Sequence, residues 1–266
     1  MRLDRALARD LRTAFASWPL RLYLLLQPAA AVVFVVRRGD ELVSSVLLIW
    51  AGLAVLGFTA WWAGRHRLAR PQPDPVPAAR ARATFALIGV AGLTLLGSGG
   101  LADLGLLPVG LGFLLSALGF GGWLWSALRS GGFTGLRERL TRDPRPFLPM
   151  LLLVGLPKLL ALGPLYVVGA TLALPSGLGQ QVLYLVGLFG PLEAASRRPA
   201  LAAVVSALAF ALIHVPMVLD ENAGDLVAAS ANVVLFQANV GLVAVLAYRR
   251  HRAVVPIGVT HALAIG

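Results

Sequence analysis

Four polar residues of this chain are of types that take part in catalytic sites: two imidazoles, which can transfer protons or hold a metal ion, and two amides, which form hydrogen bonds. Gln180 and Gln181 are adjacent amides, and His214 and His261 are imidazoles within later apolar stretches. An imidazole can act as a general base near neutral pH, whereas an amide only donates and accepts hydrogen bonds. Because polar side chains inside apolar stretches are costly unless they find partners, these four residues form the candidate catalytic set.

The spacing of the amides and His214 favours a helical hairpin. The apolar runs 178–195 and 199–218 are joined by a short basic turn, and the first run begins with the two amides. His214 lies 15 residues beyond Pro199, which is about 22 Å along a helix. An antiparallel pair of helices therefore brings these polar groups to one depth and predicts a shared polar pocket. We expect the pocket to be lined by Tyr184, Phe210 and Asn239.

Each of these polar residues also has a purely structural interpretation. Amides can cap a helix, and a histidine can form a packing contact between helices. Lys158 follows Pro157 in an apolar stretch and can bond to carbonyls that the proline frees. Asn232, Gln237 and Asn239 share one apolar stretch and can link neighbouring helices. It is the convergence of two histidines and two amides that favours a functional cavity.

The composition is that of a membrane protein. The chain has 266 residues, of which 58% are hydrophobic and 13% charged, and its mean hydropathy is +0.80. The net charge is +11, but the Arg residues lie between apolar runs, so nucleic-acid binding is not expected. The absence of Cys excludes disulfides, thiolate zinc sites and thiol catalysis.

The apolar runs predict an all-α integral membrane bundle of about eight or nine transmembrane helices, because lipid leaves the backbone no hydrogen-bond partners outside its own helix. We divide the chain into residues 1–77, an amphipathic arm with two spans and a Pro-rich loop, and residues 78–266, the remaining bundle. The expected spans are 22–36, 42–63, 84–102, 105–128, 147–173, 178–195, 199–218, 226–248 and 254–266.

Arginine alternates between the connections. It is abundant in every second one, and the intervening connections, including 174–177, are poor in basic residues. Only Arg37 and Arg38 break this pattern. The positive-inside rule therefore predicts a multi-pass protein of the cell membrane with a cytoplasmic N-terminus. The Arg-rich connections are 1–21, 64–83, 129–146, 196–199 and 249–253.

The order of the polar motifs resembles that of the CPBP family of intramembrane proteases, which includes type II CAAX prenyl endopeptidases and bacteriocin-processing proteins. That family carries E-E-x-x-x-R-G, then F-x-x-x-H, then H-x-x-x-N/D on late membrane helices. Phe210 and His214 match the second motif, and His261 begins the third. The resemblance covers about residues 147–266.

The first and third motifs depart from the family pattern. Gln180 and Gln181 stand where the family has glutamates, Leu185 replaces the arginine, and Ile265 replaces the final Asn or Asp. An alternative alignment would use Glu193 as a motif glutamate. We reject it on position, because Glu193 lies beside the basic turn and His214 lies roughly 20 Å away along the helix.

The resemblance implies roles for the matching positions. Gln180 would occupy the position of the general base, His214 would orient the attacking water, and His261 would face the oxyanion. The implied partners are the lipid bilayer and a peptide or a prenylated or lipidated protein segment. The family has been described as metalloproteases, which makes zinc the cofactor to consider, but two histidines fall short of the usual three protein ligands, and we predict no metal ligands.

Three functions follow from these observations. The first is a CAAX-protease-like protein whose hydrolysis is weakened or lost, a pseudoenzyme, because glutamine cannot accept a proton. The second is an active intramembrane peptidase that relies on His214 and His261. The third is a transporter or membrane partner protein built around Lys158 and the amides of the eighth span. CAAX enzymes process substrates on the cytoplasmic side of the membrane. The Arg pattern instead places the cavity of this protein in the outer half of the membrane. Either this protein is oriented differently from those enzymes, or the predicted number of spans is wrong by one.

Overall fold

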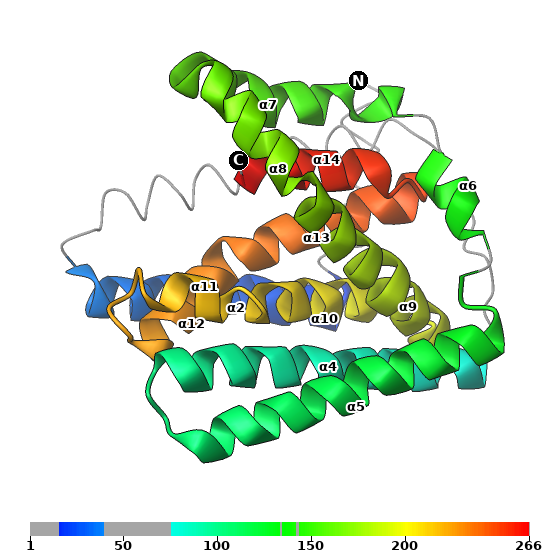
Figure 1. The fold of residues 1–266 in the computed structure, drawn as a ribbon, viewed down its shortest axis with the longest axis horizontal. Coiled ribbons are helices and arrows are strands. Elements are labelled where there is room, and N and C mark those ends of the chain that lie inside the picture. Colours follow the sequence, from blue (N-terminus) through cyan, green and yellow to red (C-terminus); the bar gives the residue numbers. More distant parts are fainter. Residues whose placement is uncertain (1–15, 40–75, 134, 142–143, 266) are drawn as a thin grey trace.

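The computed structural model describes residues 16–39, 76–133, 135–141 and 144–265, and every regular element within them is helical (Figure 1). The expected all-α fold is therefore confirmed for this part of the chain. The expected span 42–63 and the amphipathic arm lie outside it. Within the described residues, five helices are long and apolar enough to cross a membrane: Trp18–Arg37, Pro77–Leu101, Leu106–Ser130, Pro164–Ser196 and Leu226–Arg249. Three shorter apolar helices are Leu148–Leu162, Pro199–Leu212 and Val255–Ala264.

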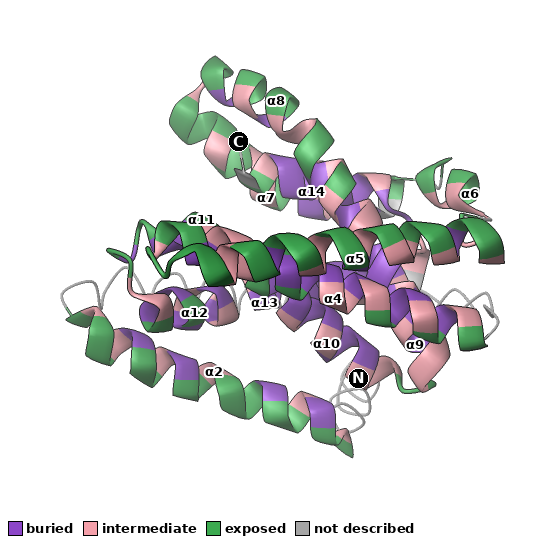
Figure 2. Ribbon diagram, turned by 60° about the horizontal axis from the view of Figure 1, so that its bottom comes forward, coloured by how far each residue is buried: buried purple, intermediate pink, exposed green. Residues whose placement is uncertain are grey.

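Helices α4 (Val76–Leu101) and α5 (Leu106–Ser130) form an antiparallel hairpin along one side of the molecule (Figure 1). Glycines allow the two backbones to touch: a Cβ added at Gly119 would lie 2.1 Å from the backbone nitrogen of Gly89. Small residues at such contacts are typical of helices that pack within lipid. The other face of α5 is exposed and apolar (Figure 2), as expected of a surface that contacts lipid.

The chain then enters a second hairpin that the sequence did not predict correctly. Helix α7 (Leu148–Leu162) ends at Gly163, and α8 (Pro164–Gln181) starts immediately after it. The expected single span 147–173 was therefore wrong. Gly163 has a φ of +67°, a conformation that suits glycine, and Pro164 can begin the next helix because its missing N–H needs no partner there.

The expected connection at 174–177 is also wrong, because Pro175 lies inside α8. The helix continues through the π-helix η3 (Val182–Phe189) into α9 (Gly190–Ser196), and the three segments form one rod of 33 residues. The turn has moved from 174–177 to Gly163 but the number of reversals is unchanged.

The centre of the molecule is built from the last third of the chain. Two expected spans are each interrupted: 199–218 breaks around His214, and 226–248 breaks at Phe236, so that neither is one regular helix. Buried residues concentrate on α10, α13 and α14, whereas α2, α7 and α8 expose much of their surface (Figure 2). The elements are α10 (Pro199–Leu212), α11 (Val215–Leu219), α12 (Leu226–Leu235), α13 (Gln237–His251) and α14 (Val255–Ile265), with α2 (Trp18–Arg37), α6 (Leu136–Thr141) and η2 (Arg145–Phe147) around them.

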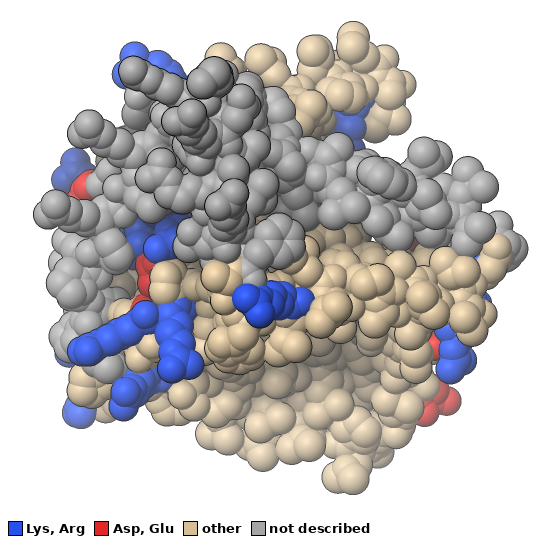
Figure 3. Space-filling view, turned by 180° about the vertical axis from the view of Figure 1, so that it is seen from behind, with Lys and Arg blue, Asp and Glu red and all other residues tan. Residues whose placement is uncertain are grey.

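Charged side chains collect at the helix ends. Arg129 lies in the last turn of α5, and Arg197 and Arg252 cap the C-termini of α9 and α13. Figure 3 shows the described Lys and Arg side chains mainly near one edge, while most of the remaining described surface is uncharged. An uncharged surface between charged helix ends is what a membrane requires.

Asp225 joins α12 to α2 at the opposite helix ends. Its Oδ1 accepts the backbone N–H groups of Val227 at 2.8 Å and Ala228 at 3.1 Å, and its Oδ2 lies 3.3 Å from the Arg37 guanidinium. The N–H of Ala228, helped by that of Val227 and the charge of Arg37, lowers the pKa of this carboxyl below its usual 3.8. Asp225 therefore stabilises the fold at neutral pH as a helix cap and an ion-pair partner.

We expect Asp225→Ala to lower the unfolding temperature modestly at pH 7, and Asp225→Asn to lower it less, because asparagine still caps the helix. A lowered pKa in the folded state means that the stabilisation is present above the unfolded pKa and is lost as pH falls through the folded pKa. The difference between wild type and Asp225→Ala should therefore shrink in acid. Thermal unfolding in detergent at several pH values measures it, and a pH-independent difference contradicts the ionic contribution.

Candidate functional site

The site begins where α8 crosses α14. The Nε2–H of His261 donates to Oε1 of Gln180 at 3.0 Å, because an amide oxygen can only accept. The amide nitrogen of Gln180 donates to the hydroxyl of Ser176 at 3.1 Å, which fixes the direction of the amide. Gly177 allows this close crossing, since a Cβ there would lie 2.7 Å from the carbonyl oxygen of Gly258. The sequence predicted that Gln180 and His261 meet, but it gave no sign of Ser176.

His214 lies in the break between α10 and α11 and is 4% exposed. Its Nδ1 is 2.7 Å from the carbonyl oxygen of Phe210, so Nδ1 carries the proton and Nε2 keeps its lone pair. The ring of Phe210 contacts both imidazoles, with centroid distances of 4.6 Å to that of His214 and 5.4 Å to that of His261. The imidazole centroids are 6.3 Å apart. The expected convergence of the two histidines is therefore present.

Tyr184 packs against the ring of Phe210. The two rings meet edge to face at 5.1 Å, and the Tyr184 hydroxyl donates to the carbonyl of Ala209 at 3.3 Å. Both side chains are buried. They are packing residues that hold the ring of Phe210 beside the histidines.

The amide pair stands directly before the π-helix η3. A π-helix is wider than an α-helix and occurs frequently at functional sites. Trp123 of α5 donates its indole N–H to the carbonyl of Gly187 at 3.0 Å, and so supports this segment from outside. No sequence pattern indicated either the π-helix or Trp123.

Gln181 points away from the Gln180 contact. It is 1% exposed, and neither its amide nitrogen nor its amide oxygen has a partner among the described residues. It lines a cavity of about 260 Å³ together with Lys158, Asn239 and His261. Gln181 is therefore the one candidate amide whose hydrogen bonds are unfilled.

Asn239 lines the same cavity, but both the oxygen and the nitrogen of its amide already form hydrogen bonds. Its oxygen accepts the hydroxyl of Tyr23, and its nitrogen donates to Gln27 at 2.9 Å and to the carbonyl of Leu235 at 2.6 Å. Tyr23 and Gln27 belong to α2, so Asn239 ties the N-terminal helix to the centre of the bundle. This is the interhelical role that amides commonly have in membranes.

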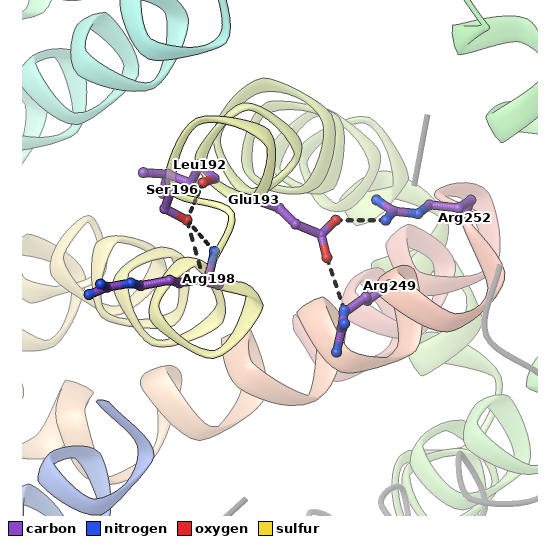
Figure 4. A network of polar contacts seen from close by, with 6 residues as sticks. All are labelled: Leu192, Glu193, Ser196, Arg198, Arg249 and Arg252. Carbon is purple, nitrogen blue, oxygen red and sulfur yellow. Dashed lines mark hydrogen bonds and ion pairs between the residues drawn. The ribbon is translucent and has the colours of Figure 1, made fainter. Parts of the chain in front are cut away.

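Glu193 is the acid nearest in sequence to the two amides, and its carboxylate is bound at another place in the fold. Its carboxylate accepts Arg249 at 2.9 Å and Arg252 at 2.7 Å, at the C-terminal end of α13 (Figure 4). The whole of α10, 14 residues or about 20 Å, separates this end from His214. The alignment that would make Glu193 a motif glutamate does not agree with this geometry.

The side chains do not fit a zinc ion. No group of three His, Cys, Asp or Glu residues that could hold a metal occurs in the described part of the chain. Structural and catalytic zinc sites use at least three protein ligands. In His261, moreover, the Nε2 already bonds to Gln180. The arrangement instead offers two bare imidazole nitrogens and one unpaired amide, which can bind hydrogen-bonding ligands.

These features define a helical, multi-pass membrane protein with a buried histidine and glutamine site on its last helices. The family model for the type II CAAX prenyl endopeptidase Rce1-like family matches residues 162–264 of this chain. The matched region contains both amides and both histidines of the site. Comparison with curated proteins and with solved structures finds no match.

Proposed function

We propose that this protein binds a peptide or a lipidated protein segment at the Gln180–His214–His261 site, with hydrolysis that is weakened or lost. The observation that carries this proposal is the 3.0 Å contact between Gln180 and His261. A neutral imidazole has one N–H, and Gln180 uses it, so His261 has none left to donate to an oxyanion. An amide at the base position cannot accept a proton, and loss of a general base typically costs roughly 10²–10⁴-fold in rate.

The membrane setting belongs to the same proposal. We infer eight or nine crossings of the cell membrane, a cytoplasmic N-terminus, and division of the chain into 1–77 and 78–266. The Arg residues at the ends of α5, α9 and α13 support a cytoplasmic location for those ends. Labelling of a cysteine introduced at Asp220 from the outer side tests this orientation, and the absence of native Cys makes the readout clean.

Peptide cleavage in proteoliposomes tests the proposed loss of hydrolysis. Wild type and His214→Ala should release product from a farnesylated fluorogenic peptide at the same rate, equal to that of protein-free liposomes. A photoreactive copy of the peptide should nevertheless crosslink to the wild-type protein, and mass spectrometry should place the crosslink near His214. Cleavage by the wild type that disappears in His214→Ala contradicts the proposal.

One observation favours the second candidate, an active peptidase. The carbonyl of Phe210 fixes the proton of His214 on Nδ1, which leaves Nε2 ready to accept a proton from water. A positioned histidine of this kind can act as a general base without a carboxylate. The cleavage assay separates the two candidates, since this one requires activity in the wild type that falls at least roughly 10²-fold in His214→Ala.

A further inference from the structure

The cavity beside Gln181 contains more hydrogen-bonding capacity than the protein uses. It lies between α7, α13 and α14, and its 260 Å³ correspond to the space of roughly nine water molecules at ~30 Å³ each. His214 and Gln180 are not part of its lining. The cavity is therefore a neighbour of the histidine site, and the two share His261.

Three polar groups of the lining have hydrogen-bond donors or acceptors that no described residue uses. Both ends of the Gln181 amide and the Nδ1 of His261 are buried without a partner among the described residues. The ammonium of Lys158 donates to the carbonyl of Ala264 and lies 5.8 Å from the ring of Tyr166, which leaves donors to spare. Among the described residues, the lining contains no Asp or Glu. Buried polar groups without partners cost stability, so a ligand that pairs with them gains affinity.

The rest of the lining needs no polar partner. The Thr260 hydroxyl donates to the carbonyl of Pro256 at 2.8 Å, and the amide of Asn239 is already engaged. The remaining walls are aliphatic and aromatic, as at Leu153, Val243 and Ile257. The cavity therefore has a small polar region, with one cation, and an apolar remainder.

We propose that this cavity binds the carboxylic acid head of a single-chain lipid, such as a medium-chain fatty acid. The carboxyl oxygens accept hydrogen bonds from Lys158 and Gln181, and the proton of the acid is shared with the bare Nδ1 of His261. The hydrocarbon chain lies against the apolar wall. This site goes beyond the proposed peptide function, because its recognition depends on Lys158, which that function does not use.

The lining favours a lipid acid over a peptide. A peptide brings an N–H and a C=O for every residue, and in an apolar cavity each of these groups needs a partner. Beyond the few groups at the polar region, the walls cannot supply such partners. A hydrocarbon chain needs none, so one acid head with an apolar tail matches both parts of the lining.

The test uses the full-length protein in lipid nanodiscs, with a photoreactive lauric acid and its methyl ester as probes. The acid should label peptides of α7, α13 or α14, and excess laurate should displace it. The ester, which has neither the charge nor the proton, should label these peptides weakly. Lys158→Met should reduce labelling by the acid at least about tenfold, the effect of losing one charge-assisted hydrogen bond, while Lys158→Arg should keep most of it.

Two further variants make the test decisive. Gln181→Met removes an amide that has no protein partner, so it should fold at least as stably as the wild type and still bind the acid more weakly. Arg129→Met, which removes a cation stacked on Trp125, is the matched control and should label like the wild type. Equal labelling by acid and ester, wild-type labelling of Lys158→Met, or displacement by an apolar peptide acid but not by laurate overturns the proposal. The readout is independent of peptide cleavage, so either proposal can fail alone.

Discussion

Glu193→Leu is expected to destabilise the protein by about 3–5 kcal/mol, the range found when one partner of a buried ion pair is removed. The carboxylate is 8% exposed and is the shared acceptor of Arg249 and Arg252 (Figure 4). Its loss leaves Arg252, whose side chain is 12% exposed, without its acid. Because α9 and α13 are joined by these bonds, the ends of both helices lose their connection.

Unfolding by denaturant in detergent, followed by tryptophan fluorescence, measures this effect. Glu221→Leu is the matched control, because Glu221 is exposed and its bond to Arg38 is made by the backbone carbonyl, which the substitution keeps. Removing the charges from both sides, as Glu193→Leu with Arg249→Leu and Arg252→Leu, should recover part of the loss, since well-packed apolar groups can replace a buried ion pair. A Glu193→Leu protein as stable as the wild type would show that the ion pairs contribute nothing.

The features predicted correctly from the sequence depend on chemistry that lipid imposes. An apolar chain in a membrane must form helices, and the described residues are helical throughout their regular elements. The depth argument from the turn at 196–199 placed the two amides at the depth of His214, and Gln180 and His214 both lie beside His261. It worked because the helical rise is nearly constant and the turn is short. The rejection of Glu193 rested on the same arithmetic, and its bonds to two arginines agree with it.

The features that were missed depend on tertiary packing. A connection was expected at 174–177, yet Pro175 lies inside α8, and Gly163 makes the turn instead. Proline within a membrane helix is tolerated when neighbours satisfy the freed carbonyl, and a sequence does not reveal those neighbours. The π-helix η3 and the carbonyl of Phe210 that orients His214 are backbone features with no residue signature.

Gln180→Glu is expected to raise the rate of peptide cleavage measurably above that of the wild type. A carboxylate at this position would lie at the Nε2 of His261, where the amide oxygen now lies at 3.0 Å, and it would accept a proton from a water shared with His214. A general base contributes roughly 10²–10⁴-fold. We expect the gain to fall at the lower end of that range, because Leu185 and Ile265 still replace the remaining motif residues.

The double variant Gln180→Glu, Gln181→Glu separates activity from stability. Gln181 is 1% exposed, so a carboxylate there is buried without a partner and should lower the stability more than the single change at the half-buried Gln180. Cleavage of the fluorogenic peptide by proteoliposomes gives the rate, with Gln180→Met as a control of similar size that has no charge. Adding His214→Ala to Gln180→Glu should abolish the gain. If Gln180→Glu folds, binds the peptide and remains silent, the missing carboxylate is not what stops hydrolysis, and Leu185 and Ile265 become the positions to restore.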